Sequence, residues 1–164
     1  MSLNKSHRYV VRTYPLGDGK LALEAPLKPR LEVATPPEYK DGVRGAWSSE
    51  ELLIGALATC FELTARAVAK RKDVPIHAFR TEATGHVQSK DGFLHFVAVE
   101  LDVLIETDGG RERDAELIAR LAEEQCTVTR ALDVPIRLTV EVRAMDQELR
   151  SGDPLFSLTE ASFR

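Results

Sequence analysis

Two thiols carry the most reactive chemistry that this sequence offers. The chain of 164 residues holds two cysteines, Cys60 and Cys126. A thiol that ionises near neutral pH is a nucleophile, and two thiols that meet in space can cycle between a dithiol and a disulfide. The first question is therefore whether the fold brings Cys60 and Cys126 together.

Cys60 lies on a predicted helix with an unusual apolar surface. Ser48 or Ser49 is expected to cap this helix, and Glu50 and Glu51 occupy the first turn, where the helix dipole favours negative charge. From Leu52 to Phe61 the helix is apolar on every side. This pattern predicts a helix buried all round, which indicates an interface between two copies of the chain.

Cys126 follows a second predicted helix, amphipathic over residues 114–125. A helix C-terminus disfavours a thiolate, so Cys126 suits a resolving role better than an attacking one. A single cysteine in an apolar helix is more often a small core residue than a nucleophile. From periodicity alone, both interpretations of Cys60 stay open.

The remaining segments predict an α+β fold. Strands are expected at residues 8–13, 20–25 and 30–34, with an Asp18-Gly19 turn in a hairpin. A hairpin of residues 77–88 and 93–106 follows the first helix, and a strand at residues 136–143 follows the second. This order favours antiparallel sheets packed on helices. We expect one domain over residues 1–145 and a C-terminal tail over residues 146–164.

Composition argues against several classes of function. Lys and Arg number 22 and Asp and Glu number 26, so the net charge of −4 gives no electrostatic argument for nucleic acid or an anionic membrane. No apolar stretch approaches the roughly 20 residues that span a bilayer, and the first residues lack the apolar segment of a signal peptide. We therefore expect a cytoplasmic protein, in which any disulfide is transient. His86 and His95 could face each other across the hairpin without a third ligand, so neither a metal nor a cofactor is predicted.

The sequence around both cysteines resembles a known family. The segment from Glu50 to Phe61, Glu-Glu-Leu-Leu-Ile-Gly-Ala-Leu-Ala-Thr-Cys-Phe, resembles the first cysteine motif of the OsmC/Ohr family, the osmotically induced and organic hydroperoxide resistance proteins. The segment from Cys126 to Leu132, Cys-Thr-Val-Thr-Arg-Ala-Leu, is similar to the family's second motif, Cys-Pro-Val-x-x-x-Leu. The resemblance covers roughly residues 8–143 and points to the OsmC-like subgroup.

This resemblance implies an intertwined homodimer, in which antiparallel sheets wrap two central helices and the active sites lie at the subunit boundary. It also implies a thiol-dependent peroxidase, in which Cys60 attacks an organic hydroperoxide, releases an alcohol and becomes a sulfenic acid. Cys126 then condenses with Cys60 to form a disulfide, which an external dithiol reduces. Glu50 falls on the family's glutamate, which holds an arginine over the thiolate.

The sequence departs from the family's motifs at three places. Ser48-Ser49 replaces an Asn-Pro ahead of the glutamate, and Thr127 replaces the proline after the second cysteine. In the hydroperoxide-resistance branch the arginine lies in the first hairpin turn, where Gly17 falls here. Other branches draw it from the loop before the helix, where Arg44 or Arg30 could serve. The source of positive charge matters, because burial alone raises the pKa of a thiol.

Two other interpretations stay open. A non-catalytic dimer of the same fold would bind a small apolar ligand and keep its cysteines as core residues. A plain interaction module would leave the two sulfurs far apart. A guanidinium within hydrogen-bond reach of the Cys60 sulfur favours the enzyme, whereas an all-apolar shell favours the ligand-binding protein.

Overall fold

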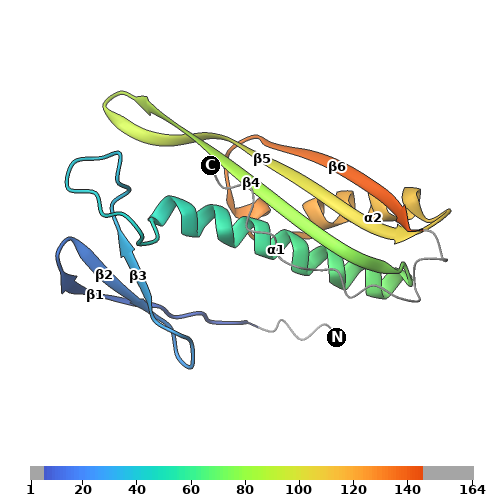
Figure 1. Ribbon diagram of the computed structural model, residues 1–164, viewed down its shortest axis with the longest axis horizontal. Coiled ribbons are helices and arrows are strands. Elements are labelled where there is room, and N and C mark those ends of the chain that lie inside the picture. The colour runs from blue at the N-terminus through green and yellow to red at the C-terminus, as the bar shows by residue number, and fades with distance from the viewer. Residues whose placement is uncertain (1–5, 146–164) are drawn as a thin grey trace. The chain divides into compact units, whose positions relative to one another are not determined.

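The computed structural model describes residues 6–145 and has an α+β architecture, which confirms the predicted fold class. The chain divides into two compact units, one ending at Ala56 and one beginning at Leu57. This division falls inside helix α1 (Ser49–Lys72) (Figure 1). The predicted tail, residues 146–164, lies outside the described residues.

The first unit contains an antiparallel sheet of three strands, β1 (Arg12–Gly17), β2 (Lys20–Glu24) and β3 (Leu31–Ala34). The turn between β1 and β2 has a left-handed backbone, with φ of 91° at Gly17 and 74° at Gly19. Glycine adopts this conformation at little cost because it has no Cβ. β1 begins later than predicted, because its pairing starts at Arg12, opposite the last residue of β2.

A capping box starts α1. Ser48 Oγ accepts a hydrogen bond from the Glu51 backbone N–H at 3.0 Å, and the Glu51 carboxylate accepts one from the Ser48 N–H at 2.7 Å. These bonds satisfy amide groups that the first turn and its cap would otherwise leave unpaired. Just before the cap, Trp47 exchanges two backbone hydrogen bonds with β3, at Glu32 and Ala34. The beginning of the helix is therefore attached to the first sheet.

In the single chain, α1 buries one face rather than its whole surface. The buried positions recur mostly every three or four residues, as expected for one side of a helix: Leu57, Phe61, Ala65, Val68 and Ala69. Between them, Leu63 is 68% exposed. The stretch predicted to be buried all round, residues 52–61, is also only partly buried in the single chain, where Ala56 and Thr59 are exposed; its burial by a second copy stays a prediction.

The same helix corrects a second expectation. By length and composition alone, α1 is long and apolar enough to cross a membrane, although no such stretch was expected. Its uncharged run is short, but the helix on either side of Glu62 adds enough apolar residues to reach that length. The core helix of a soluble protein can have the same length and composition, so this property by itself does not indicate a membrane protein.

The second unit is built on a sheet in the order β4–β5–β6, formed by β4 (Ile76–Lys90), β5 (Phe93–Asp108) and β6 (Ile136–Met145). β4 and β5 form a long antiparallel hairpin, whereas β6 runs parallel to β5. The expectation of antiparallel sheets did not include this parallel pairing. Alternation along a strand shows which side chains face the core but not which way the strand runs.

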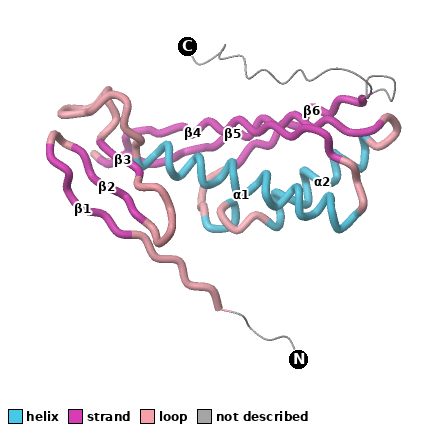
Figure 2. The backbone as a smooth tube through the Cα atoms, turned by 60° about the horizontal axis from the view of Figure 1, so that its bottom comes forward, coloured by secondary structure: helices cyan, strands magenta, loops and turns pink. Residues whose placement is uncertain are grey.

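Helix α2 (Glu112–Gln125) and the second unit's part of α1 lie on one face of this sheet (Figures 1 and 2). The ring centroids of Phe61 on α1 and Phe79 on β4 are 6.2 Å apart. The other core side chains alternate along β5 or follow one face of α2, and each is at most 3% exposed: Val99, Leu101, Val103, Ile105, Ala115, Ile118, Ala119 and Ala122. The small residues on α2 allow it to approach its neighbours closely.

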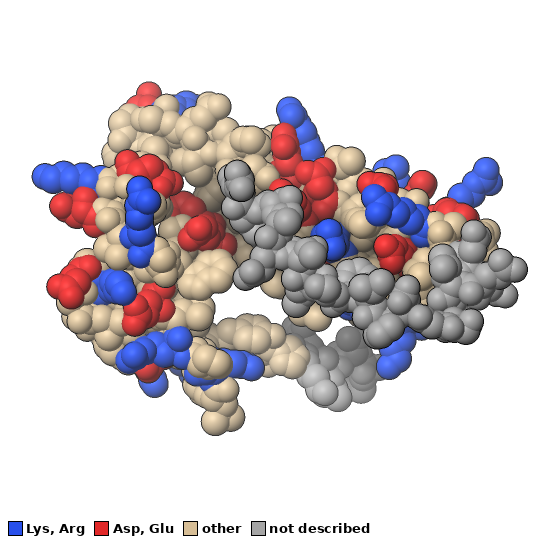
Figure 3. All heavy atoms as spheres, viewed as in Figure 1, with Lys and Arg blue, Asp and Glu red and all other residues tan. Residues whose placement is uncertain are grey.

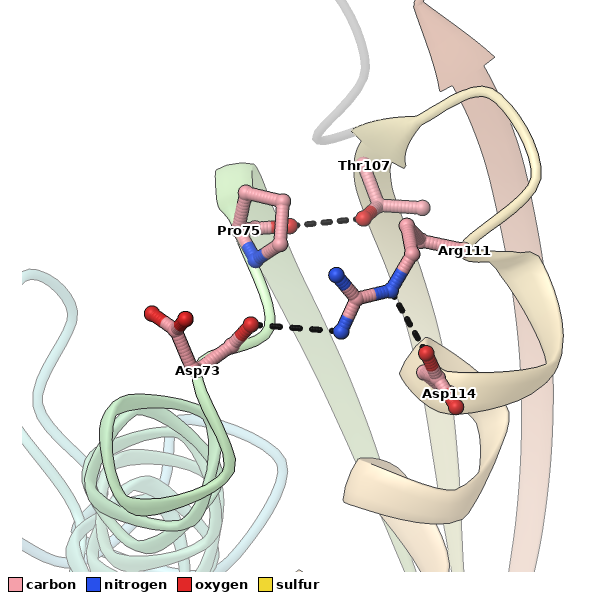
Figure 4. Close-up of polar contacts among 5 residues, drawn as sticks. All are labelled: Asp73, Pro75, Thr107, Arg111 and Asp114. Carbon is pink, nitrogen blue, oxygen red and sulfur yellow. Dashed lines mark hydrogen bonds and ion pairs between the residues drawn. The ribbon is translucent and has the colours of Figure 1, made fainter.

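A polar network joins the end of α1 to the beginning of α2 (Figure 4). Thr107 Oγ1 donates a hydrogen bond to the Pro75 carbonyl oxygen at 2.6 Å. Arg111 donates to the Asp73 carbonyl oxygen at 3.2 Å through Nη2 and to the Asp114 carboxylate at 2.6 Å through Nε. These contacts fix where α2 starts, and hence where its far end lies along α1.

Charged side chains of both signs intermingle on the face shown in Figure 3. Oppositely charged side chains pair at 2.8 Å between Lys20 and Glu32 and at 2.6 Å between Glu62 and Arg66. Exposed pairs of this kind contribute only about 0–1 kcal/mol each to stability.

Candidate functional site

The fold brings the two cysteines into contact. Cys60 is half-buried in the middle of α1, and Cys126 is fully buried at the residue where α2 ends. Hydrogen bonding with the Cys126 side chain lowers the pKa of the Cys60 thiol. Both are free thiols. A plain interaction module would have kept the sulfurs apart, so this geometry argues against that interpretation.

Two backbone amides also lower the pKa of the Cys60 thiol through hydrogen bonding. They are the N–H groups of Val128 and Thr127, in the loop directly after Cys126. The Thr64 hydroxyl, one helical turn beyond Cys60, has the smallest effect on the pKa of the Cys60 thiol. Its single proton is donated to the Cys60 carbonyl oxygen at 2.7 Å, so we take the amides and the Cys126 thiol as the main donors.

These groups lower the pKa of Cys60. Burial is the largest single influence and would raise the pKa of the thiol, because a charged sulfur is poorly solvated there. Hydrogen bonds from Val128, Cys126 and Thr127 together outweigh burial and lower the pKa below the ordinary value of a cysteine. A thiol with a lowered pKa has more of the reactive thiolate at neutral pH.

The predicted activating residues lie in the first unit or at its edge. Arg44 is exposed in the loop before α1, and Arg30 is exposed just before β3. Glu50 is half-buried in the first turn of α1, ten positions before Cys60 in the sequence. The roles of Arg44 and Glu50 at the thiolate stay predictions.

The structure gives a physical reason for the glycine in the first hairpin turn. With φ of 91°, Gly17 has a backbone conformation that other residues rarely adopt. A Cβ built there would meet no atom within 4 Å, so the constraint is the backbone and not a lack of space. An arginine at this position would strain the turn in its present form.

Sequence reasoning missed the two amide donors. Backbone N–H groups belong to every residue except proline, so residue type alone does not identify them. The available signal was Thr127 itself, a residue with an N–H directly after the second cysteine. Among the described residues, no group of three or more His, Cys, Asp or Glu side chains could hold a metal ion.

A half-buried thiol of lowered pKa, in contact with a second thiol on an α+β scaffold, defines a candidate dithiol redox centre. Comparison with protein families then identifies the scaffold. Residues 40–141 match the family described as OsmC-like protein, and the chain belongs to this family.

Known proteins agree with this assignment, YmaD in sequence and the solved structures in fold. The uncharacterized protein YmaD of Bacillus subtilis is 26% identical over 110 residues, which are 64% of this chain and 73% of YmaD. An OsmC-like protein of unknown function from Vibrio cholerae has a TM-score of 0.73 at 14% identity, covering 83% of this chain and 100% of its own. An organic hydroperoxide resistance protein OsmC from Legionella pneumophila has a TM-score of 0.68 at 20% identity, covering 86% and 100%.

Proposed function

We propose that this protein is a thiol-dependent peroxidase that reduces organic hydroperoxides to alcohols. The observation that supports this most directly is the Cys60 sulfur, which has a lowered pKa through hydrogen bonding despite its burial and contacts a second thiol. A thiolate is the form of cysteine that attacks a peroxide, and an adjacent thiol can resolve the product. The family and the name of the Legionella pneumophila protein support a peroxide-related role.

In the first proposed step the Cys60 thiolate attacks the terminal oxygen of the hydroperoxide. The S–O bond forms as the O–O bond breaks, so two electrons pass from sulfur to the peroxide. The alkoxide takes a proton and leaves as an alcohol, while Cys60 becomes a sulfenic acid. The hydrogen bonds to the thiolate favour the charged reactant that this step consumes.

In the second step the Cys126 sulfur attacks the sulfenic sulfur. The S–S bond forms, and the sulfenic hydroxyl leaves with the thiol proton as water. The contact between Cys126 and Cys60 supports this step, because the resolving sulfur already lies beside its target. An external dithiol then reduces the disulfide by exchange and is itself oxidised to a disulfide.

We further propose that Glu50 holds Arg44 as a second source of charge for the thiolate, with Arg30 as the alternative. The proposed setting is the cytoplasm, with no cofactor and no metal. Arg44→Ala would then slow peroxide reduction further than Lys40→Ala, a charge loss in the same loop. Equal rates for the two variants would remove Arg44 from the mechanism.

The active protein is proposed to be a homodimer. Only 28% of the most apolar stretch of α1 is buried in the single chain, and Leu63 is 68% exposed. The end of the β4–β5 hairpin adds Phe93 and Leu94, which are 71% and 53% exposed. Large exposed apolar surfaces mark interaction sites. Light scattering is expected to give twice the chain mass of 18.2 kDa, and a folded monomer at micromolar concentration would contradict the dimer.

The direct test of function is turnover of cumene hydroperoxide with an excess of dithiol. Wild type is expected to consume the peroxide, and Cys60→Ser is expected to lose this activity. Without reductant, Cys126→Ser is expected to accumulate a sulfenic acid that dimedone traps after one turnover. Equal, negligible rates for wild type and Cys60→Ser would refute the peroxidase.

A further inference from the structure

A buried hydroxyl without a partner lies on the residue that contacts the second thiol. The backbone N–H of Thr129 donates a hydrogen bond to Cys126 Sγ, with 3.5 Å between nitrogen and sulfur. The side-chain oxygen of the same residue, Thr129 Oγ1, is buried and has no hydrogen-bond partner among the described residues 6–145. A buried polar group that stays unpaired costs stability, so a hydroxyl kept at this position requires an explanation.

The backbone holds Thr129 firmly beside Cys126. The Thr129 carbonyl oxygen accepts a hydrogen bond from the Leu132 N–H at 3.3 Å, so both backbone groups of Thr129 have partners. The Cys126 carbonyl oxygen accepts from the Arg130 N–H at 3.1 Å, which closes the turn that contains Thr129. Rotation about the Cα–Cβ bond of Thr129 therefore redirects its hydroxyl without moving the backbone.

The second proposed step has to move a proton inside a closed site. Cys126 gives up its thiol proton as it attacks the sulfenic sulfur of Cys60, and the sulfenic hydroxyl needs a proton to leave as water. Cys126 is 0% exposed, so its proton has no direct exit to bulk solvent in this conformation. A hydroxyl can accept one hydrogen bond and donate another, which is the property that a proton relay requires.

We propose that the Thr129 hydroxyl relays the proton from Cys126 to the leaving hydroxyl in the resolving step. Thr129 Oγ1 accepts the thiol proton of Cys126 as the S–S bond forms, and its own proton passes to the oxygen that leaves Cys60. The thiol and the sulfenic acid become a disulfide and water, and Thr129 recovers its hydroxyl. This inference rests on the proposed peroxidase, whose second step it completes.

A relay and a structural role predict different effects of Thr129→Val. This change replaces the hydroxyl with a methyl group, and because the hydroxyl has no partner among the described residues, we expect the urea midpoint to stay the same or to rise. The relay predicts that the same variant resolves the sulfenic acid more slowly. A loss of function without a loss of stability would mark a hydroxyl kept for the reaction.

Two further variants control for packing. Thr129→Ser keeps the hydroxyl and loses only the methyl group, so it is expected to resolve the sulfenic acid as wild type does. Thr81→Val makes the same chemical change at a second buried hydroxyl without a partner in the described part of the chain. Thr81 lies on β4, outside the loop that follows Cys126, and its variant is also expected to behave as wild type.

The test follows how fast the Cys60 sulfenic acid becomes a disulfide. Reduced protein receives a slight excess of cumene hydroperoxide without dithiol, and samples are quenched at intervals with dimedone and N-ethylmaleimide. Mass spectrometry then measures the dimedone adduct of Cys60 and the Cys60–Cys126 disulfide. Thr129→Val is expected to form the disulfide at least about tenfold more slowly than wild type and to accumulate the adduct, because a group that transfers the proton is lost.

Several results would overturn the relay. Disulfide formation as fast in Thr129→Val as in wild type would do so, and so would an equal loss of rate in Thr81→Val. A Thr129→Ser variant as slow as Thr129→Val would assign the effect to packing of the methyl group. If Thr129→Val fails to fold, Thr129→Ala removes the same hydroxyl with a smaller side chain, and a wild-type rate in that variant would overturn the relay.

Hydrogen peroxide separates this inference from the proposed function, because it oxidises a reactive thiol to a sulfenic acid without any organic substrate. Slower disulfide formation by Thr129→Val with hydrogen peroxide, but no turnover of cumene hydroperoxide by wild type, supports the relay and refutes the peroxidase. Turnover by wild type, with equal disulfide formation in wild type and Thr129→Val, supports the peroxidase and overturns the relay. A wild type that forms no Cys60–Cys126 disulfide with either peroxide also overturns the relay.

Discussion

One buried hydroxyl offers a sharp test of how the ends of the two helices are joined. Thr107 is fully buried near the end of β5, and its Oγ1 donates to the Pro75 carbonyl oxygen at 2.6 Å. Thr107→Val keeps the shape of the side chain and replaces the hydroxyl with a methyl group. The Pro75 carbonyl oxygen then loses its donor and faces an apolar atom.

The expected loss of stability follows from this geometry. A net hydrogen bond is worth about 1 kcal/mol, and a buried acceptor left without a partner costs about 1–3 kcal/mol. The bond is only partly buried, so the lower part of this range applies, and we expect about 1–2 kcal/mol. In urea, where unfolding free energy falls by roughly 1–3 kcal/mol per molar, the midpoint should fall by about 0.5–1 M.

The same chemical change at Thr81 provides the matched control. In the described part of the chain, Thr81 Oγ1 on β4 is buried without a hydrogen-bond partner. Thr81→Val therefore removes an unpaired polar atom and is expected to leave stability unchanged or to raise it. Urea unfolding of both variants should be measured under reducing conditions at one protein concentration, because the stability of a dimer depends on concentration. A Thr107→Val midpoint equal to that of wild type, or equal losses for both variants, would refute the reasoning.

Three further changes test other parts of the molecule. Ser48→Ala removes the acceptor of the Glu51 amide, and we expect it to lower the free energy of unfolding in urea by about 1 kcal/mol. Ser49→Ala, at the exposed first helical position, should lower it clearly less. The reverse order would show that the cap is misassigned. Phe61→Ala, at a fully buried position, is expected to cost about 3–5 kcal/mol, and a loss below about 1 kcal/mol would mean that this site is loosely packed. Burial raises the pKa of Cys60 on folding, but hydrogen bonding outweighs burial, so the folded pKa lies below the unfolded pKa. The Cys60 thiolate therefore adds stability that is fully present above the unfolded pKa and is lost as pH falls through the folded pKa. The difference in unfolding free energy between wild type and Cys60→Ser should therefore grow from acid to alkaline pH, and a constant difference would contradict the lowered pKa.

Much of the fold was predictable because local signals decide it. Ser48 with Glu51 three residues later is the pattern of a capping box, and both of its hydrogen bonds form. The alternation along residues 93–106 correctly predicted a strand, which extends to Asp108. The two cysteine motifs correctly predicted the family. In each case neighbouring residues in the sequence settle the outcome.

Features that depend on distant residues were not predictable in the same way. The direction of β6 is set by its pairing with β5, from Val99 opposite Ile136 onward, and alternation is the same in either direction. The start of β1 is set by where β2 ends. The partial exposure of α1 depends on what packs against it, which the composition of residues 52–61 does not reveal.

The candidate site shows this limit most clearly, because the pKa of its thiol is lowered mainly by two backbone amides and a second thiol. A search by residue type looks for a guanidinium near Cys60, whereas the donors found in the second unit are two amides and a thiol. Their position next to Cys126 has a consequence for the proposed reaction. Before attack the loop must stay close, since its amides favour the thiolate. After attack the sulfenic sulfur carries no charge, so the amides hold it less strongly. In the proposed reaction, the loss of charge on Cys60 therefore weakens the hydrogen bonds from the loop at the step in which Cys126 attacks.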